Sequence, residues 1–144
     1  MRIQGLYTTY DINATRGISI NANYYNEITN KLVISAKRYL KKNKFIVRKL
    51  DVPGVFEIPI AIKNNINKYD AFVALGCVIK GKTPHFDFIC KTTFDSIMQL
   101  SINFNKPIGN GIITALNKKQ AHERCGIGLN KKPNKGFEAS RAII

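Results

Sequence analysis

The sequence predicts an α/β fold in which a central parallel sheet of four strands is flanked by helices. Short β-type segments alternate with segments of helical period along the chain, which is the pattern of βαβ units. Residues 71–79 are almost entirely apolar, as expected for a central parallel strand that is buried on both faces. The 144 residues are enough for one well-packed core, and no repeat or low-complexity linker divides them. We therefore expect residues 1–144 to form a single domain.

The strands are predicted from their β-type composition and from the turn residues that end them. The pair Pro53-Gly54 closes the second strand and turns the chain sharply. The fourth strand contains Gly109 and Gly111. In chain order, the expected strands cover residues 17–22, 45–52, 71–79 and 108–115.

Apolar residues at helical spacing predict the helices between and after these strands. The helix over residues 26–42 has one apolar stripe, formed by Ile28, Leu32, Ala36, Tyr39 and Leu40. The longest helix covers residues 85–103, and its inward side chains are expected to be Phe86, Ile89, Cys90, Phe94, Ile97, Met98 and Ile102. Shorter helices are expected over residues 58–67, 117–124 and 134–144, with Asn117 and Gln120 in capping-box positions and a loop over residues 126–133.

The topology predicts where a ligand would bind. In open parallel sheets, ligands lie beyond the carboxyl ends of the strands. That edge gathers the loops that follow the four predicted strands, namely residues 23–25, 53–57, 80–85 and the chain from residue 115 onward.

The loop over residues 80–85 has the chemistry of an anion site. Thr83 is a good N-cap, Pro84 suits the first helical position, and Gly81 allows close backbone approach. The N–H groups of the first helical turn favour a small anion. His85 follows, and histidine is the side-chain type that titrates near neutrality. The segment indicates either proton transfer on a phosphorylated small molecule or a surface histidine at an ordinary helix start.

Glu57, which follows the Pro53-Gly54 turn, also has two interpretations. The helix dipole favours an acid at the start of the next helix, whatever its function. In a binding cleft, the same carboxylate would accept hydrogen bonds from sugar-like hydroxyls.

Composition argues against several classes of function. There are 23 Lys and Arg against 9 Asp and Glu, a net charge of +14, but the basic residues are scattered among many Asn and Ile, which indicates compositional bias rather than a nucleic-acid partner. Cys77, Cys90 and Cys125 form no CxxC pair, which argues against a zinc knuckle or redox dithiol, and Cys77 and Cys90 are expected in the core. No apolar run approaches the roughly 20 residues that span a membrane, and no leader pattern is present, so we expect a cytoplasmic protein without a membrane partner.

Five motifs follow one another along the chain. They read VPGxFEIP over residues 52–59, YDAxxxLGxVIxGxTxHFD over 69–87, PIxxGIxT over 107–114, QAxER over 120–124 and NKGxEA over 134–139. Together, and in this order from Ile18 to the C-terminus, they resemble the lumazine synthases. The resemblance implies a flavodoxin-like three-layer sandwich and a transferase of riboflavin biosynthesis. Such an enzyme condenses 5-amino-6-(D-ribitylamino)uracil with 3,4-dihydroxy-2-butanone 4-phosphate and needs no cofactor or metal.

The resemblance also implies roles for single residues. Those implied to bind the pyrimidine and its ribityl chain are Tyr24, which stacks on the ring, Val55, Phe56, Glu57, Val78 and Ile79. Those implied to lie near the phosphate and the reacting groups are Lys82, Thr83, the proton-transferring His85, the phosphate-binding Arg124, Lys135 and Glu138.

The chain departs from the family pattern at two places in the implied site. Asn23-Tyr24-Tyr25 stands where the family has Arg-Phe-Asn, so an aromatic ring is kept but an amide becomes Tyr25. Asn110 stands where many members place an aromatic side chain that covers the substrate ring from a neighbouring subunit. His122 is expected to be a surface residue.

Three alternatives to the enzyme remain open at the level of sequence. A non-catalytic protein of the same fold would retain lumazine or flavin without turnover, but it would not need His85, Arg124 and Lys135. A flavodoxin-like FMN protein would need a hydroxyl-rich phosphate loop after the first strand, and residues 23–26 do not form one. The third is the basic nucleic-acid protein already considered.

The resemblance implies a ring of five subunits with sites between neighbours. Some members close twelve such rings into a shell and have a short loop between the last two helices. Here that loop, residues 126–136, is longer by a few residues and carries Lys131 and Lys132. We therefore expect a pentamer, or a decamer of two rings, rather than a 60-subunit shell.

Overall fold

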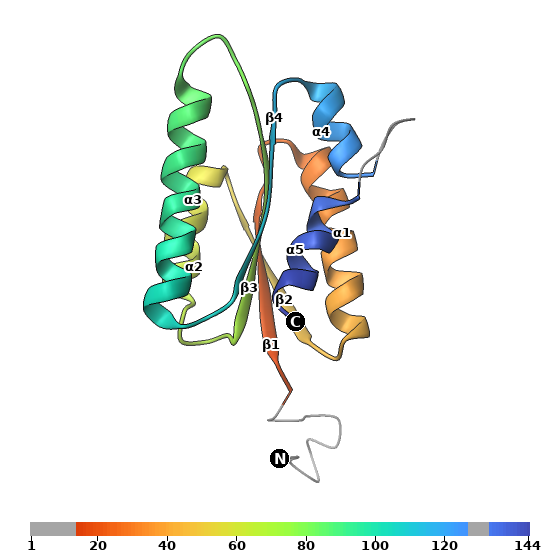
Figure 1. The fold of residues 1–144 in the computed structure, drawn as a ribbon. Coiled ribbons are helices and arrows are strands. Elements are labelled where there is room, and N and C mark those ends of the chain that lie inside the picture. The colour runs from red at the N-terminus through yellow and green to blue at the C-terminus, as the bar shows by residue number, and fades with distance from the viewer. Residues whose placement is uncertain (1–13, 127–132) are drawn as a thin grey trace.

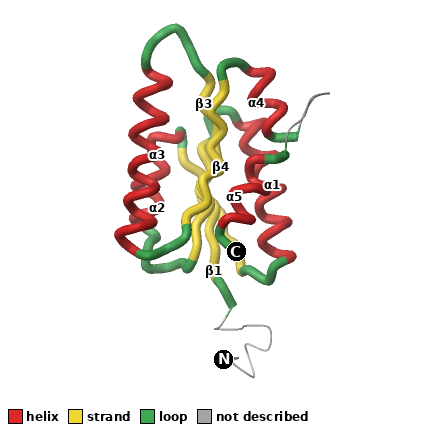
Figure 2. Tube along the Cα trace, in the orientation of Figure 1, coloured by secondary structure: helices red, strands yellow, loops and turns green. Residues whose placement is uncertain are grey.

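The computed structural model describes residues 14–126 and 133–144, which form three layers around a parallel sheet (Figure 1). The strand order is β2-β1-β3-β4, and every neighbouring pair is parallel. The strands are β1 (Arg16–Ala22), β2 (Ile46–Val52), β3 (Ala71–Ile79) and β4 (Ile108–Ala115). The helices are α1 (Asn26–Lys42), the 3-10 turn η2 (Val55–Glu57), α2 (Ile58–Asn64), α3 (His85–Phe104), α4 (Lys118–Arg124) and α5 (Lys135–Ala142). Figure 2 shows α2 and α3 on one face of the sheet and α1, α4 and α5 on the other, which confirms the predicted α/β sandwich.

Most predicted boundaries agree with the structure, and α1, β3 and β4 have the bounds expected from the sequence. Helix α2 is the main exception, since it ends at Asn64 rather than near residue 67. The Asn65 side chain donates a hydrogen bond to the Ala61 carbonyl at 2.8 Å, while the Asn65 amide turns to the Ile62 carbonyl at 3.0 Å. The asparagine therefore takes the carbonyl that would continue the helix.

Two of the residues predicted to face inward from α3 are exposed. Met98 is 61% exposed and Ile102 is 69% exposed, whereas Thr93 and Ile97 are buried. Each residue turns the helix by about 100°, so Met98 cannot share the inward direction of Ile97, and Ile102 points about 140° away from it. The prediction was wrong at these two positions because an apolar side chain does not by itself indicate which face it occupies.

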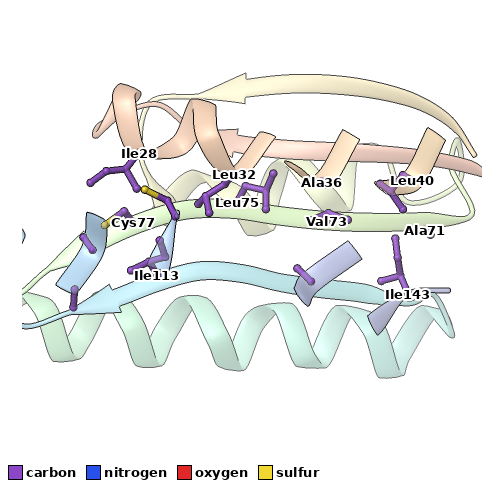
Figure 3. Packing of buried hydrophobic residues seen from close by; sticks show 14 residues of the cluster. Ile28, Leu32, Ala36, Leu40, Ala71, Val73, Leu75, Cys77, Ile113 and Ile143 are labelled. Atoms are coloured by element: carbon purple, nitrogen blue, oxygen red, sulfur yellow. The ribbon is translucent and has the colours of Figure 1, made fainter. Parts of the chain in front are cut away.

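The core consists of two clusters, one on each face of β3. Alternate residues of this strand, Ala71, Val73, Leu75 and Cys77, pack under α1 and α5. Figure 3 shows the α1 stripe of Ile28, Leu32, Ala36 and Leu40 lying along them. Phe72 and Ala74 point to the other face and pack with residues of α2 and α3. Burial on both sides explains why residues 71–79 are so uniformly apolar.

The carboxyl ends of the strands lie together at the upper edge of the sheet in Figure 1. The loops after β1, β2 and β3 all leave the sheet at this edge. Within the described part of the chain, no helix is long and apolar enough to cross a bilayer.

Candidate active site

A cleft of about 710 Å³ lies at this edge of the sheet, between the start of α3 and the loop after β1. Three of the four predicted loops contribute to its walls, so the topology placed the cavity correctly. Eight of the site residues predicted from the sequence line it: Tyr24, Val55, Phe56, Glu57, Val78, Ile79, Thr83 and His85. Lys82 lies between two lining residues, Gly81 and Thr83, and is exposed.

The loop after β1 is fixed by the buried Thr29 in the first turn of α1. The Thr29 hydroxyl donates to the Ala22 carbonyl at 2.7 Å, and its amide donates to the Tyr25 carbonyl at 2.9 Å. At the start of the loop, the Asn23 amide donates to the Val52 carbonyl of β2 at 2.9 Å. The backbone that carries Tyr24 is therefore held on both sides.

A carboxylate on β2 adds to this anchoring. Asp51 accepts a hydrogen bond from Asn21 Nδ2 at 3.0 Å. The hydrogen bond from Asn21 lowers the pKa of Asp51, partly offset by burial, with smaller contributions from Asn23 and Lys49. Asp51 therefore stays ionised at neutral pH and joins the ends of β1 and β2.

Gly76 of β3 allows the wall that carries Glu57 to approach the sheet. A Cβ at Gly76 would lie 2.9 Å from Ala22 Cβ and 2.9 Å from Val55 Cγ1, which is closer than side chains tolerate. The absence of a side chain lets η2 pack against β1 and β3, with Val55 buried. Phe56 and Glu57 follow on the same short turn and face the cleft.

His85 is the first residue of α3, and it lies exposed in the cleft wall. The predicted cap was wrong by one residue, because Pro84 rather than Thr83 is the N-cap. The Pro84 carbonyl accepts from the amides of Asp87 and Phe88 at 3.1 and 3.3 Å, so it provides the first helical acceptor. Thr83 Oγ1 accepts only a long hydrogen bond, 3.4 Å, from the His85 amide. The Thr83 side chain thus adds little to the cap of α3, and the loop that carries it lines the cleft at Gly81 and Thr83.

Two side chains in the cleft, Cys77 and Tyr25, stay neutral at pH 7. Burial raises the pKa of the Cys77 thiol to about 12, with a smaller effect from Cys125. Burial also raises the pKa of Tyr25, helped by Tyr24 and Cys77. A protonated thiol is a poor nucleophile, so Cys77 contributes to the floor of the cleft by packing.

Part of the apolar wall of the cleft was not predicted as a binding surface. Phe86 and Ile89 of α3 line the cleft, although both were assigned to the core by helical period alone. Both side chains are half-buried, and Ile89 also packs against the core cluster that contains Phe72. Their three-residue spacing after the Gly81–Thr83 loop is the signal that would have found them.

Four other predicted site residues do not line this cleft. Asn110 lies within β4 opposite Ala74, away from the strand end, and its Oδ1 accepts from the Ile112 amide at 3.0 Å. Arg124 is exposed at the end of α4. Lys135 and Glu138 form an ion pair at 3.7 Å on α5, which packs against α1 and β4. Within one chain, the predicted site residues therefore fall into two groups: those at the cleft and these four, which do not line it.

The three cysteines, a metal site and His122 were also considered in the sequence, and the structure bears on each of them. Cys77 and Cys125 are buried, and Cys90 is half-buried. Among residues 14–126 and 133–144, no group of three or more His, Cys, Asp or Glu side chains is arranged to hold a metal ion. His122 is half-buried beside a small cavity, and Lys131 and Lys132 lie outside the described residues.

The chain is similar in sequence to one known family of proteins. The sequence pattern of the family described as 6,7-dimethyl-8-ribityllumazine synthase matches residues 15–144. A protein of that name from Bartonella bacilliformis is 38% identical over 129 residues, which cover 87% of this chain and 85% of the relative. One from Campylobacter jejuni subsp. doylei is 40% identical over 130 residues, covering 87% and 82%, and one from Corynebacterium kroppenstedtii is 38% identical over 118 residues, covering 82% and 74%. A family match over residues 15–144, together with relatives 38–40% identical over most of the chain, shows that this chain belongs to the 6,7-dimethyl-8-ribityllumazine synthase family.

Proposed function

We propose that this chain, acting as one domain, forms 6,7-dimethyl-8-ribityllumazine from 5-amino-6-(D-ribitylamino)uracil and 3,4-dihydroxy-2-butanone 4-phosphate. This is the penultimate step of riboflavin biosynthesis. The observation that carries the proposal is the cleft in which Tyr24, Glu57 and His85 meet at the carboxyl edge of the sheet. Its relatives bear the name of this enzyme over most of their length. The polar, phosphorylated substrates would be retained inside a cell, and we place the reaction in the cytoplasm.

The proposed chemistry proceeds by transfers of protons between bound reactants. The 5-amino group attacks the ketone carbon, and loss of water gives an imine. Elimination then breaks the carbon–oxygen bond to phosphate, and the ribityl-bearing nitrogen closes the ring with loss of a second water. His85 would accept and return protons during these steps. Holding both reactants in one cleft supplies much of the remaining rate enhancement, and no step requires a metal or a cofactor.

The cleft walls suit the two substrates differently. The exposed ring of Tyr24 would stack on the pyrimidine, and Glu57 would accept hydrogen bonds from ribityl hydroxyls. The open loop over Lys82 and Thr83 would receive the phosphate. A Cβ at Gly81 would meet no atom within 4 Å, so this side of the loop has room for a ligand.

We propose further that Arg124 and its neighbours complete the site of an adjacent subunit in a ring of five. The separation of Arg124, Lys135, Glu138 and Asn110 from the cleft of their own chain supports this arrangement. Exposed apolar side chains on the outer helices also favour association, namely Ile60, Phe88, Met98 and Ile102. For the ring itself we favour a free pentamer or a decamer over a 60-subunit shell.

The first experiment measures turnover by the purified full chain. Both substrates are supplied, and lumazine and inorganic phosphate are expected to appear in equal amounts. Tight binding of added lumazine without formation of either product would instead identify a non-catalytic carrier.

Complementation between two inactive variants tests the shared site. His85→Ala and Arg124→Ala chains are denatured, mixed in equal amounts and refolded together. If each site combines His85 of one subunit with Arg124 of the next, random mixing restores about one quarter of the wild-type activity. Each variant refolded alone is the control, and a mixture no more active than these would refute the shared site. Light scattering on the wild type then decides between pentamer, decamer and shell.

A further inference from the structure

We infer that Tyr25 is a positioning residue that orients the Tyr24 ring for stacking on the pyrimidine. The inference rests on the proposed function and concerns a position where this chain departs from the family pattern, because an amide usually follows the stacking aromatic. Tyr25 is thereby given a task that the family pattern does not assign to it.

The Tyr24 ring has little else to hold it. Its side chain is 76% exposed, so one face of the ring is open to the cleft. The ring centroids of Tyr24 and Tyr25 are 4.9 Å apart, and the ring planes cross at 87°. This is the edge-to-face geometry that aromatic pairs prefer. The Tyr25 ring is therefore the contact that restricts where an exposed ring can turn.

The Tyr25 ring can act as a support because it is itself held. It is half-buried and packs against the cluster that contains Ile28 and Cys77. Tyr25 lines both the main cleft and a cavity of about 160 Å³ beside Ile28, Lys118 and His122. It thus forms the wall between the cleft and α4.

The backbone does not explain the orientation of Tyr24 by itself. Thr29 and Val52 fix the loop through hydrogen bonds to its main-chain groups, but these bonds leave the Tyr24 side chain free to rotate. Fixing a ring before binding removes part of the entropy cost of fixing it on binding. Loss of the Tyr25 ring should therefore weaken pyrimidine binding while the loop stays in place.

The test is a double-mutant cycle on Tyr24 and Tyr25. The readouts are the Kd of the product lumazine and the separate KM values of the two substrates. Tyr25→Leu is expected to raise the lumazine Kd and the pyrimidine KM about 2- to 10-fold. It should leave the KM of the phosphorylated ketone within about twofold of the wild-type value. Tyr25→Phe keeps the ring and should behave as wild type.

The cycle separates positioning from direct contact. In a Tyr24→Leu background, Tyr25→Leu should cause no further loss, because the ring that it supports is gone. Equal losses in both backgrounds would overturn the inference, as would an unchanged Kd in Tyr25→Leu. If Tyr25→Leu melts early, Tyr25→Met fills the same space without a ring and takes its place in the cycle.

Tyr39 provides a matched control. It is also a half-buried tyrosine with an edge-to-face partner, Phe137, at 4.8 Å and 77°, but it does not line the cleft. Tyr39→Leu should lower the melting temperature and leave the lumazine Kd unchanged. A Kd that rises equally in the Tyr39 and Tyr25 variants would mean that general loosening, not positioning, causes the effect. The Kd is measured without turnover, so it tests the role of Tyr25 independently of the reaction. Wild-type protein that binds lumazine but makes none would refute the proposed reaction, while the Kd values of the variants would still decide whether Tyr25 positions Tyr24.

Discussion

Replacing Gly76 by alanine tests how the cleft is built. The new Cβ would lie 2.9 Å from both Ala22 Cβ and Val55 Cγ1. Ordinary contacts begin near 3.4 Å, so each of these two contacts must lengthen by about half an ångström. Val55 is a buried side chain with few rotamers, and Ala22 can move only with its backbone. Relief of the clash therefore displaces the end of β1 or the turn η2.

The expected cost can be estimated from these contacts. Overpacking a core by one methyl group costs about 1–3 kcal/mol. Replacing glycine restricts the unfolded chain and returns about 0.4–1 kcal/mol. For a chain of this size, about 1 kcal/mol corresponds to roughly 3–4 °C in melting temperature. Gly76→Ala should therefore melt a few degrees below wild type, and its turnover should fall as well because η2 carries Glu57.

Gly81→Ala is the matched control for stability. The same methyl group at Gly81 would meet no atom within 4 Å, so its melting temperature should equal or slightly exceed that of the wild type. Thermal unfolding followed by circular dichroism at one protein concentration compares the three proteins. A Gly76→Ala protein that melts at or above the wild-type temperature would refute the packing account of this wall.

Three further predictions follow from the site. His85→Ala should slow lumazine formation by roughly 10²–10⁴-fold with little change in melting temperature, since it removes the exposed side chain that we propose as the proton shuttle; unchanged turnover would remove His85 from the mechanism. Arg124→Ala should raise the KM of the phosphorylated ketone about 10- to 100-fold, with partial rescue by lysine, and a loss confined to the pyrimidine would contradict the phosphate assignment. The hydrogen bond from Asn21 lowers the pKa of Asp51, so this carboxylate stabilises the fold above its ordinary pKa of about 3.9, and that contribution is lost as the pH falls through the lower folded value. The urea midpoint of Asp51→Asn should therefore change less than that of wild type between about pH 5 and pH 2, and equal slopes would count against the pairing.

The fold could be predicted from the sequence because apolar residues recur at the buried positions of each helix and strand. Strand β3 is apolar throughout since both of its faces are covered, and α1 shows its inward stripe since only one of its faces is. The prediction of the inward face failed on α3, where adjacent residues are both apolar and only one of them can point into the core. Ile97 and Met98 are neighbours in sequence, and only the packing of α3 decides that Ile97 is inside.

The site could be predicted only in part for a similar reason. Topology brings the loops of Tyr24, Glu57 and His85 together, whatever their side chains do. Arg124 stands at the end of α4 and does not line that cleft. Its position depends on how α4 is placed relative to the sheet, and no local sequence pattern indicates that placement. The contact between Tyr24 and Tyr25 is a matter of ring orientation, and adjacent residues carry no periodic signal for it.

The double hold of Thr29 on the loop after β1 has a consequence for how this site can evolve. One residue binds the Ala22 carbonyl through its hydroxyl and the Tyr25 carbonyl through its amide, so the chain from residue 22 to residue 29 forms a closed circuit. An inserted or deleted residue within it would break one of these bonds and shift α1 along the sheet. New specificity at this wall must therefore arise by exchange of side chains at constant length. The difference between Asn23-Tyr24-Tyr25 and the Arg-Phe-Asn that the family resemblance implies is of that kind. A library for altered pyrimidines should therefore vary the identities of these residues and leave their number alone.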